Sequence, residues 1–191
     1  LEAHPKITYL EGQAELVSTT ELRVNGATLK APKVVIATGS SAFIPPIEGL
    51  TQVQYLTSTE ALELKKLPKS MLVIGANAIG LELAQMFAHV GVKVTIHEVA
   101  GRIAPYEEPE ISEALTKYLT EEGIEICTCT KVLEVRQDDK QITITAQMPD
   151  GKPQEFIAEA LLVATGRRPN TQGLGLERAG VALTKRGGIQ V

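Results

Sequence analysis

A glycine-rich turn and an acid that follows it are the residues of this chain with the clearest chemical potential. Four consecutive apolar residues, 71–74, precede a six-residue turn made of Gly75, Ala76, Asn77, Ala78, Ile79 and Gly80. Glycine lets the backbone approach a pyrophosphate, and the N-terminus of the next helix supplies amide donors and partial positive charge. Glu98 ends the following strand, near the offset of roughly 20 residues at which an acid accepts ribose hydroxyls. This spacing predicts a site for a nicotinamide dinucleotide.

Asn77 departs from the G-x-G-x-x-G pattern, because it stands where the second glycine is expected. Asparagine is the side chain that best replaces glycine in a left-handed backbone, so we expect a positive φ at Asn77. Asn77→Gly should then keep or improve nucleotide affinity, and Asn77→Val should damage fold and binding. A glycine turn that joins strand to helix without a ligand is the competing interpretation, but it does not call for Glu98.

The composition excludes several classes of protein. The chain has 191 residues, 43% of them hydrophobic, which suffices for a real core. A net charge of −4 gives no electrostatic footprint for nucleic acid or an anionic membrane, and no apolar run is long enough to span a bilayer. Cys127 and Cys129 lack a third ligand nearby, so we expect structural thiols rather than a metal site, in a reducing, cytoplasmic setting.

The elements around the turn predict an α/β fold. A helix follows the turn and ends at Gly91, and a second opens with Pro109 and ends at Gly123. Its buried side is expected to carry Ile111, Leu115, Tyr118 and Leu119. Thr57 and Glu60 predict a capping box for a short helix. Residues 33–39 recur as 161–166, and each copy follows an antiparallel meander with a turn pair. We expect a Rossmann-like parallel sheet with a β-meander in three layers, plus flanking segments.

The order of these motifs resembles one enzyme family. The fingerprint, the G-L-E-L-A helix at 80–84, the strand ending in Glu98, E-P-E-I at 108–111, the meander and A-T-G-R-R-P-N at 164–170 are similar to the NAD(P)H-binding domain of flavin-dependent pyridine nucleotide-disulfide oxidoreductases. Within that family, residues 58–70 and the helix containing residues 85–88 resemble mercuric reductases most, then dihydrolipoamide dehydrogenases.

The resemblance implies a division of the chain and roles for single residues. Residues 1–50 would be the C-terminal part of an FAD-binding domain, 51–168 the NAD(P)H-binding domain, and 169–191 a return segment to the FAD domain. Glu82 would pair with a lysine beside the flavin, and Gly166 would pass near the nicotinamide. Ala78 occupies a position at which many relatives carry a bulky gating residue, and departs from that pattern.

The resemblance also implies what lies outside this chain. The redox cysteine pair, the catalytic histidine, and the missing FAD and dimerisation domains would belong to the same polypeptide, a homodimer, so we expect this fragment to hold no catalytic residue or metal ligand and to be inactive alone. We expect NAD(H) to be preferred over NADP(H), because Glu98 would repel a 2′-phosphate and Arg102 is the one nearby cation.

Three functional classes follow from these observations. The favoured one is the dinucleotide-binding part of a flavoenzyme that reduces mercuric ion, or alternatively lipoamide or another disulfide. The second is a non-catalytic nucleotide-binding module. The third is an S-adenosylmethionine-dependent methyltransferase, in which the duplicated A-T-G segments would have no role.

Overall fold

The computed structural model describes residues 6–191, which divide into two compact units. Residues 42–166 form the larger unit, and the described part of residues 1–41 together with 167–191 forms the smaller one. Every residue expected at the nucleotide site lies in the larger unit. No helix within residues 6–191 is long and apolar enough to cross a membrane.

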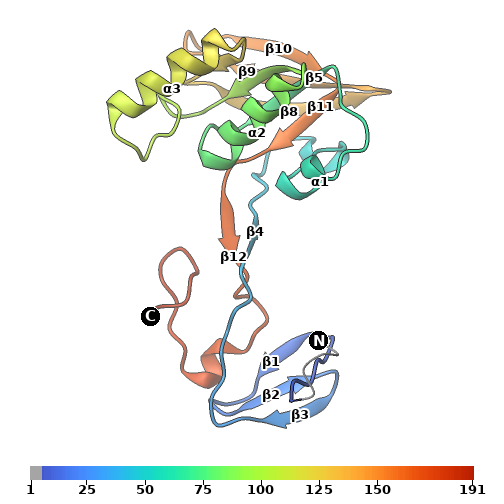
Figure 1. The fold of residues 1–191 in the computed structure, drawn as a ribbon, viewed down its shortest axis with the longest axis vertical. Helices are drawn as coiled ribbons and strands as arrows, with labels where there is room; N and C mark the ends of the chain where they lie inside the picture. The colour runs from blue at the N-terminus through green and yellow to red at the C-terminus, as the bar shows by residue number, and fades with distance from the viewer. Residues whose placement is uncertain (1–5) are drawn as a thin grey trace. The chain divides into compact units, whose positions relative to one another are not determined.

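A four-stranded parallel sheet forms the centre of the larger unit (Figure 1). Its strands, in the order in which they pair, are β11 (Ala160–Val163), β5 (Ser70–Ile74), β6 (Lys93–His97) and β7 (Glu125–Cys127). Four successive residues of β5, from Met71 to Ile74, are buried. Such a run requires cover on both faces of the sheet, which is why this strand shows no polar alternation.

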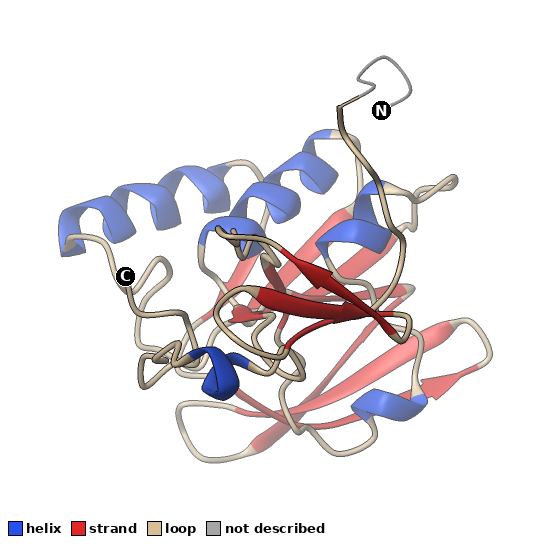
Figure 2. Cartoon of the chain, turned by 90° about the horizontal axis from the view of Figure 1, so that it is seen from below, coloured by secondary structure: helices blue, strands red, loops and turns tan. Residues whose placement is uncertain are grey.

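Helices cover one face of this sheet. Helix α2 (Ala78–His89) connects β5 to β6, and α3 (Pro109–Glu121) lies between β6 and β7 in the chain. Phe87 of α2 and Leu119 of α3 belong to one buried cluster with Val94 of β6. The two helices run side by side (Figure 2), and the Glu122 carboxylate accepts hydrogen bonds from Gln85 and from the His89 ring.

A meander covers the opposite face. Strands β8 (Lys131–Asp138), β9 (Gln141–Gln147) and β10 (Pro153–Ala158) pair antiparallel in the order β10-β9-β8. Ile142 and Ile144 of β9 pack with Leu72 and Leu161 of the parallel sheet in a second buried cluster. The larger unit therefore has the expected three layers, with helices, a parallel sheet and an antiparallel meander.

Local signals at the ends of elements are confirmed. Helix α1 (Ser58–Leu62) begins with the expected capping box, in which the backbone N–H of Thr57 donates to the Glu60 carboxylate at 2.8 Å. Hydrogen bonds from the Thr57 hydroxyl and the Thr57 backbone N–H to the carboxylate lower the pKa of Glu60 below its usual value. Pro109 occupies the first turn of α3, as its fixed φ favours.

The smaller unit contains an antiparallel sheet of β1 (Ala14–Leu16), β2 (Glu21–Val24) and β3 (Ala27–Lys30). Asn25 and Gly26, with φ of 49° and 84°, form the expected tight turn between β2 and β3. Strand β4 (Ser40–Ala42) pairs with β12 (Arg167–Pro169). Two short 3-10 helices complete the chain, η1 (Leu50–Gln52) in the larger unit and η2 (Leu176–Ala179) in the smaller.

Only one of the two similar segments, 33–39 and 161–166, contains the expected strand. The second copy contains β11, which pairs with β5, whereas residues 33–39 lie outside every strand of the described chain and Val35 is 88% exposed. The prediction of a buried strand there is wrong for this structure. An apolar run becomes a strand only when a neighbouring strand pairs with it, and within residues 6–191 no strand pairs with this segment, although Thr38 and Gly39 form hydrogen bonds with Asn170.

The predicted buried face of α3 is also wrong in part. Ile111 and Tyr118 are 48% and 58% exposed, while Ser112 and Leu119 are buried. The Ser112 hydroxyl donates to the carbonyl of Ile103 at 2.6 Å. This hydrogen bond directs a polar residue inward. The helix therefore presents Ser112 to the core together with Leu119, which was expected there, and leaves Ile111 and Tyr118 exposed.

Candidate dinucleotide-binding site

The glycine turn is built for close packing between β5, α2 and the end of β11. Gly75 has a φ of +102°, and a Cβ placed on it would lie 2.6 Å from the Ala164 carbonyl oxygen. A Cβ on Gly80 would lie only 2.1 Å from the Gly75 carbonyl oxygen. Neither position has room for a side chain, so α2 starts directly against the turn. The first N–H groups of α2, which have no intrahelical partner, therefore face the turn.

Asn77 does not carry the left-handed backbone that we expected. Its φ is −107° and its ψ −173°, an extended conformation, and it is the N-cap of α2. The positive φ falls at Gly75 instead, two residues earlier, so the chain has already turned when it reaches Asn77. The Asn77 side chain accepts a hydrogen bond from the Ala78 N–H at 3.0 Å. Asparagine is present here as a helix cap rather than as a substitute for glycine.

This assignment changes the expected effect of mutating Asn77. Asn77→Ala should lower the free energy of unfolding by about 1 kcal/mol, because the cap is lost, and Asn77→Gly by only a few tenths. Asn77→Ser should behave like the wild type. Urea unfolding of the three variants measures these differences. A wild-type stability for Asn77→Ala would show that the side chain does not cap α2.

Glu98 ties the turn to the segment that follows β6. It is 8% exposed, and its two carboxylate oxygens accept hydrogen bonds from the Ala76 N–H at 2.7 Å and the Ala100 N–H at 2.8 Å. Its own backbone N–H and carbonyl bond to Cys127 and Thr130. Glu98 therefore contacts the glycine turn, as the sequence pattern predicts, and its carboxylate is fixed by one N–H before it and one after it in the chain.

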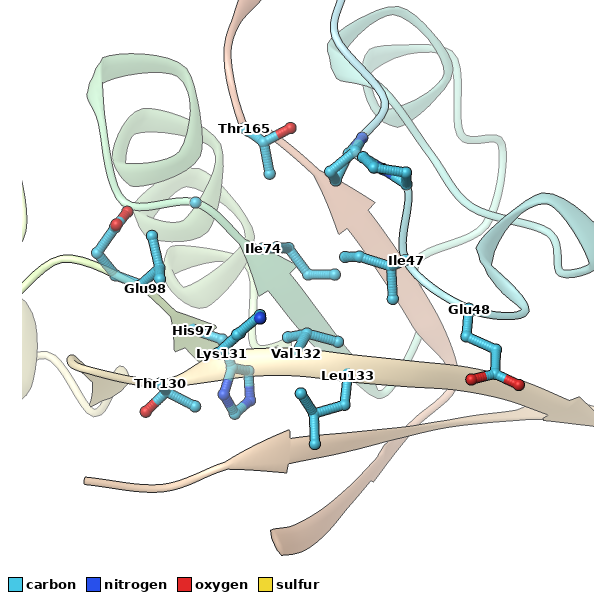
Figure 3. Close-up of a pocket in the computed structure, with 14 residues that line it drawn as sticks. Ile47, Glu48, Ile74, His97, Glu98, Thr130, Lys131, Val132, Leu133 and Thr165 are labelled. Carbon is cyan, nitrogen blue, oxygen red and sulfur yellow. The ribbon is translucent and has the colours of Figure 1, made fainter. Parts of the chain in front are cut away.

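A pocket of about 640 Å³ opens beside Glu98 and the turn (Figure 3). Its walls are segments 45–48, 74–75, 97–99 and 130–133, together with Thr165. Most of the lining is apolar, with a few polar groups, and the volume lies in the range of roughly 300–1,000 Å³ typical of small-molecule sites. The pocket is at the carboxyl ends of β5 and β6, where open α/β sheets bind ligands.

His97 contributes a buried imidazole to this pocket. The side chain is 1% exposed, and its ring meets the Phe156 ring edge-on with centroids 4.4 Å apart. Neither ring nitrogen has a hydrogen-bond partner within residues 6–191. Burial lowers the pKa of His97 from 6.5 to about 4, so the ring is neutral at physiological pH. The sequence placed this histidine beside the acid, but gave no sign of its burial or of its missing partners.

The other expected site residues are arranged less closely. Ala78, Ile79 and Gly80 form the first turn of α2, and Ala76 is fully buried behind the turn. Glu82 lies on the exposed side of α2, and its side chain has no hydrogen bond or ion pair within residues 6–191. Gly166 has a φ of +127°, and a Cβ placed on it would meet no atom within 4 Å.

The two cysteines differ in their burial and backbone conformation. No group of three or more metal-binding side chains occurs among residues 6–191. Cys127 ends β7 and is half-buried, and burial, then the charge of Glu125, raises the pKa of its thiol. Cys129 is exposed and has a φ of +52° in the turn after the strand, so the two thiols do not lie on one strand face.

Lys131 and segment 45–48 were not predicted as part of this site. Both approach the pocket from elements distant in sequence, β8 and the chain before η1 (Figure 3). The only sequence signal for His97 was its position: strand alternation places it on the face opposite Ile96, toward the meander. The pocket itself depends on how the meander packs, which no local pattern encodes.

Comparison with known proteins identifies relatives of this fold and site. The family model for pyridine nucleotide-disulphide oxidoreductases matches residues 1–191. A mercuric reductase of Streptomyces lividans is 48% identical over 86% of this chain, and a dihydrolipoyl dehydrogenase of Thermus scotoductus is 40% identical over 97%. Both resemblances expected from the sequence, and their order, are confirmed.

A solved structure shares the whole fold. The HOCl-induced flavoprotein disulfide reductase RclA from Escherichia coli superposes on 100% of this chain with a TM-score of 0.90 and 34% sequence identity. The chain covers 34% of the Streptomyces protein, 41% of the Thermus protein and 43% of the RclA chain. It thus spans well under half the length of these relatives. By its family model, its sequence relatives and its structure, the chain belongs to the pyridine nucleotide-disulphide oxidoreductase family.

Proposed function

We propose that residues 42–166 bind NAD(H), with the pyrophosphate over the turn from Gly75 to Gly80 and the adenosine in the pocket beside Glu98. The observation that carries this proposal is the Glu98 carboxylate, held at 2.7 Å from the Ala76 N–H of the glycine turn and lining a pocket of about 640 Å³. Phosphate-binding backbone and ribose-binding acid thus meet at one end of the sheet, as a dinucleotide requires.

Each part of the turn contributes to binding in a different way. Because Gly75 and Gly80 have no Cβ, α2 can begin close to the phosphates. The first backbone N–H groups of α2 can then donate hydrogen bonds to them. Glu98 retains lone pairs for the two ribose hydroxyls besides those used for Ala76 and Ala100. When bound, the dinucleotide supplies a hydride to the flavin of the parent enzyme, and this chain supplies its placement.

The same groups support a preference for NAD(H) over NADP(H). A 2′-phosphate would lie beside the Glu98 carboxylate, and like charges repel strongly in a partly buried site. Arg102 does not offset this repulsion, because its guanidinium donates to the carbonyl oxygens of Pro105 and Glu107 at 3.0 and 2.9 Å. Calorimetric titration with both cofactors tests the preference, and NADPH binding tenfold tighter than NADH would contradict it.

Glu98→Gln should weaken NADH binding by about ten- to a hundredfold, because hydrogen bonds to a charged acceptor contribute roughly 1.5–3 kcal/mol. The matched control is Glu121→Gln, which removes the same charge from an exposed position on α3, away from the pocket, and should leave the affinity unchanged. Calorimetry with NADH and with ADP-ribose measures both variants. Equal affinities for Glu98→Gln and wild type would show that the Glu98 carboxylate does not bind the dinucleotide.

We propose further that the parent polypeptide is a homodimeric flavoenzyme that uses FAD and transfers electrons from NAD(H) to mercuric ion. The identity to mercuric reductases supports Hg(II) as substrate. The second candidate is a dihydrolipoamide dehydrogenase or another disulfide reductase, supported by the Thermus relative and by RclA. Assays of NADH oxidation by the full-length protein with Hg(II) and with lipoamide distinguish the two.

The 191-residue chain alone should contain no flavin and oxidise no NADH with Hg(II) or a disulfide as acceptor. It nevertheless has two buried clusters of its own in residues 42–166, so it should fold. The visible absorbance spectrum of the purified chain tests for bound flavin, and an assay of NADH oxidation with Hg(II) or a disulfide tests for turnover. Copurifying FAD in equal amount, or measurable turnover, would show that the chain is catalytically complete.

A further inference from the structure

His97 is the one polar side chain of the pocket that is both almost completely buried and without a partner in residues 6–191. The imidazole is 1% exposed, and both ring nitrogens lack hydrogen bonds. The other polar side chains of the lining differ: the hydroxyls of Thr130 and Thr165 donate to backbone carbonyls, and Glu48 and Lys131 are exposed. A buried, unsatisfied polar group is costly, so its presence in a pocket calls for an explanation.

The surroundings of His97 do not supply that explanation. The ring is packed edge-on against Phe156, and its register neighbours on the parallel sheet are Ile74 and Cys127. These side chains offer shape and apolar cover, and a phenylalanine would fill the same place without leaving polar atoms unpaired. The imidazole is therefore not required by packing. Its lowered pKa, caused by burial, leaves it neutral, with one nitrogen as donor and the other as acceptor.

The position of His97 relative to Glu98 suggests which ligand group it meets. The two residues are consecutive and line the same pocket (Figure 3). If Glu98 holds the adenosine ribose, the base attached to that sugar lies one glycosidic bond away, over the neighbouring part of the pocket. Adenine carries an exocyclic amino donor and ring-nitrogen acceptors, which match the mixed donor and acceptor character of a neutral imidazole.

We propose that His97 recognises the adenine base, its neutral imidazole forming a hydrogen bond with the amino edge, an inference that rests on the proposed NAD(H)-binding function. The ring nitrogens are covered in this structure, so binding includes a side-chain movement. Rotation of the imidazole about its second torsion is soft for histidine, and the exposed Lys131 side chain is free to move from the pocket wall. His97 thus selects the base, and Glu98 the sugar.

The test compares wild type with His97→Phe, which keeps an aromatic ring for Phe156 but removes both nitrogens, and with His97→Asn, which keeps one donor and one acceptor. Calorimetry is performed with NADH and with the reduced nicotinamide purine dinucleotide, in which a hydrogen atom replaces the adenine amino group, so that the proposed hydrogen bond is lost for either tautomer of the imidazole. His89→Gln is the control, since His89 lies on α2 and pairs with Glu122, outside the pocket.

Wild type should bind NADH about tenfold more tightly than the purine analogue, which is the effect of about one hydrogen bond. His97→Phe should bind NADH about tenfold more weakly than wild type and should no longer distinguish the two dinucleotides. It should be no less stable than wild type at neutral pH. His97→Asn should recover part of the difference in affinity between the two dinucleotides. Unchanged NADH affinity or retained discrimination in a folded His97→Phe overturns the role of His97 and leaves the NAD(H) function standing. A wild-type chain that binds neither dinucleotide overturns both.

Discussion

Gly80→Ala is expected to destabilise the chain by about 2 kcal/mol, although alanine stabilises most helix interiors relative to glycine. The reason is the 2.1 Å distance between a Cβ at this position and the backbone carbonyl oxygen of Gly75, with the Ala164 side chain 3.3 Å away on the other side. A backbone atom cannot rotate aside as a flexible side chain does. The helix would have to move away from the glycine turn.

This displacement should also abolish NADH binding, because the amides at the start of α2 would leave the phosphates. Urea unfolding and calorimetry measure the two effects on the same variant. The matched control is Gly91→Ala, which has a left-handed φ of +89° but nothing within 4 Å of its Cβ. It should lose about 1 kcal/mol from backbone strain and keep its affinity for NADH. A Gly80→Ala chain as stable as wild type would show that the turn and helix are not in contact as described.

Stability is expected to fall by about 3 kcal/mol through His97 as the pH drops from 6.5 to about 4. Above pH 6.5 the histidine is neutral in both the folded and the unfolded chain and contributes no pH dependence. Below that pH the unfolded chain binds a proton that the folded chain, with its pKa lowered by burial, cannot. Unfolding is therefore favoured progressively until the folded-state pKa is reached.

The measurement is the difference in unfolding free energy between wild type and His97→Phe across this range. Carboxylates also titrate near pH 4, but they do so in both proteins and cancel in the difference. Wild type should lose stability relative to His97→Phe by about 1.4 kcal/mol for each pH unit in the middle of the range. Parallel profiles for wild type and His97→Phe would mean that the buried ring binds a proton as readily as in the unfolded chain.

The sequence alone determined the elements whose signals are local. The apolar run of β5, the glycines after it, α2 and the strand ending in Glu98 form one continuous unit of the chain, and the structure has them in that arrangement. The capping box at Thr57 and the proline at the start of α3 were also predicted. These features depend on interactions between residues a few positions apart, so composition and spacing suffice to find them.

Only the tertiary structure decided where the backbone is left-handed and which side chains are buried. The positive φ falls at Gly75 and not at Asn77, because the turn must pass the carbonyl of Ala164, a residue 89 positions later in the chain. Whether residues 33–39 form a strand depends on a neighbouring strand that pairs with them. Which residues of α3 face the core depends on the Ile103 carbonyl that accepts the Ser112 hydrogen bond.

The nucleotide site shows the same division. Its turn and its acid follow from spacing, but the pocket walls come from β8 and from residues 45–48, and they meet β6 only because the meander packs on that face of the sheet. The same packing buries His97 against Phe156 and leaves its ring nitrogens without hydrogen-bond partners in the described part of the chain. Burial and the pKa that it lowers are properties of contacts between distant segments, and so no pattern along the chain could have predicted them.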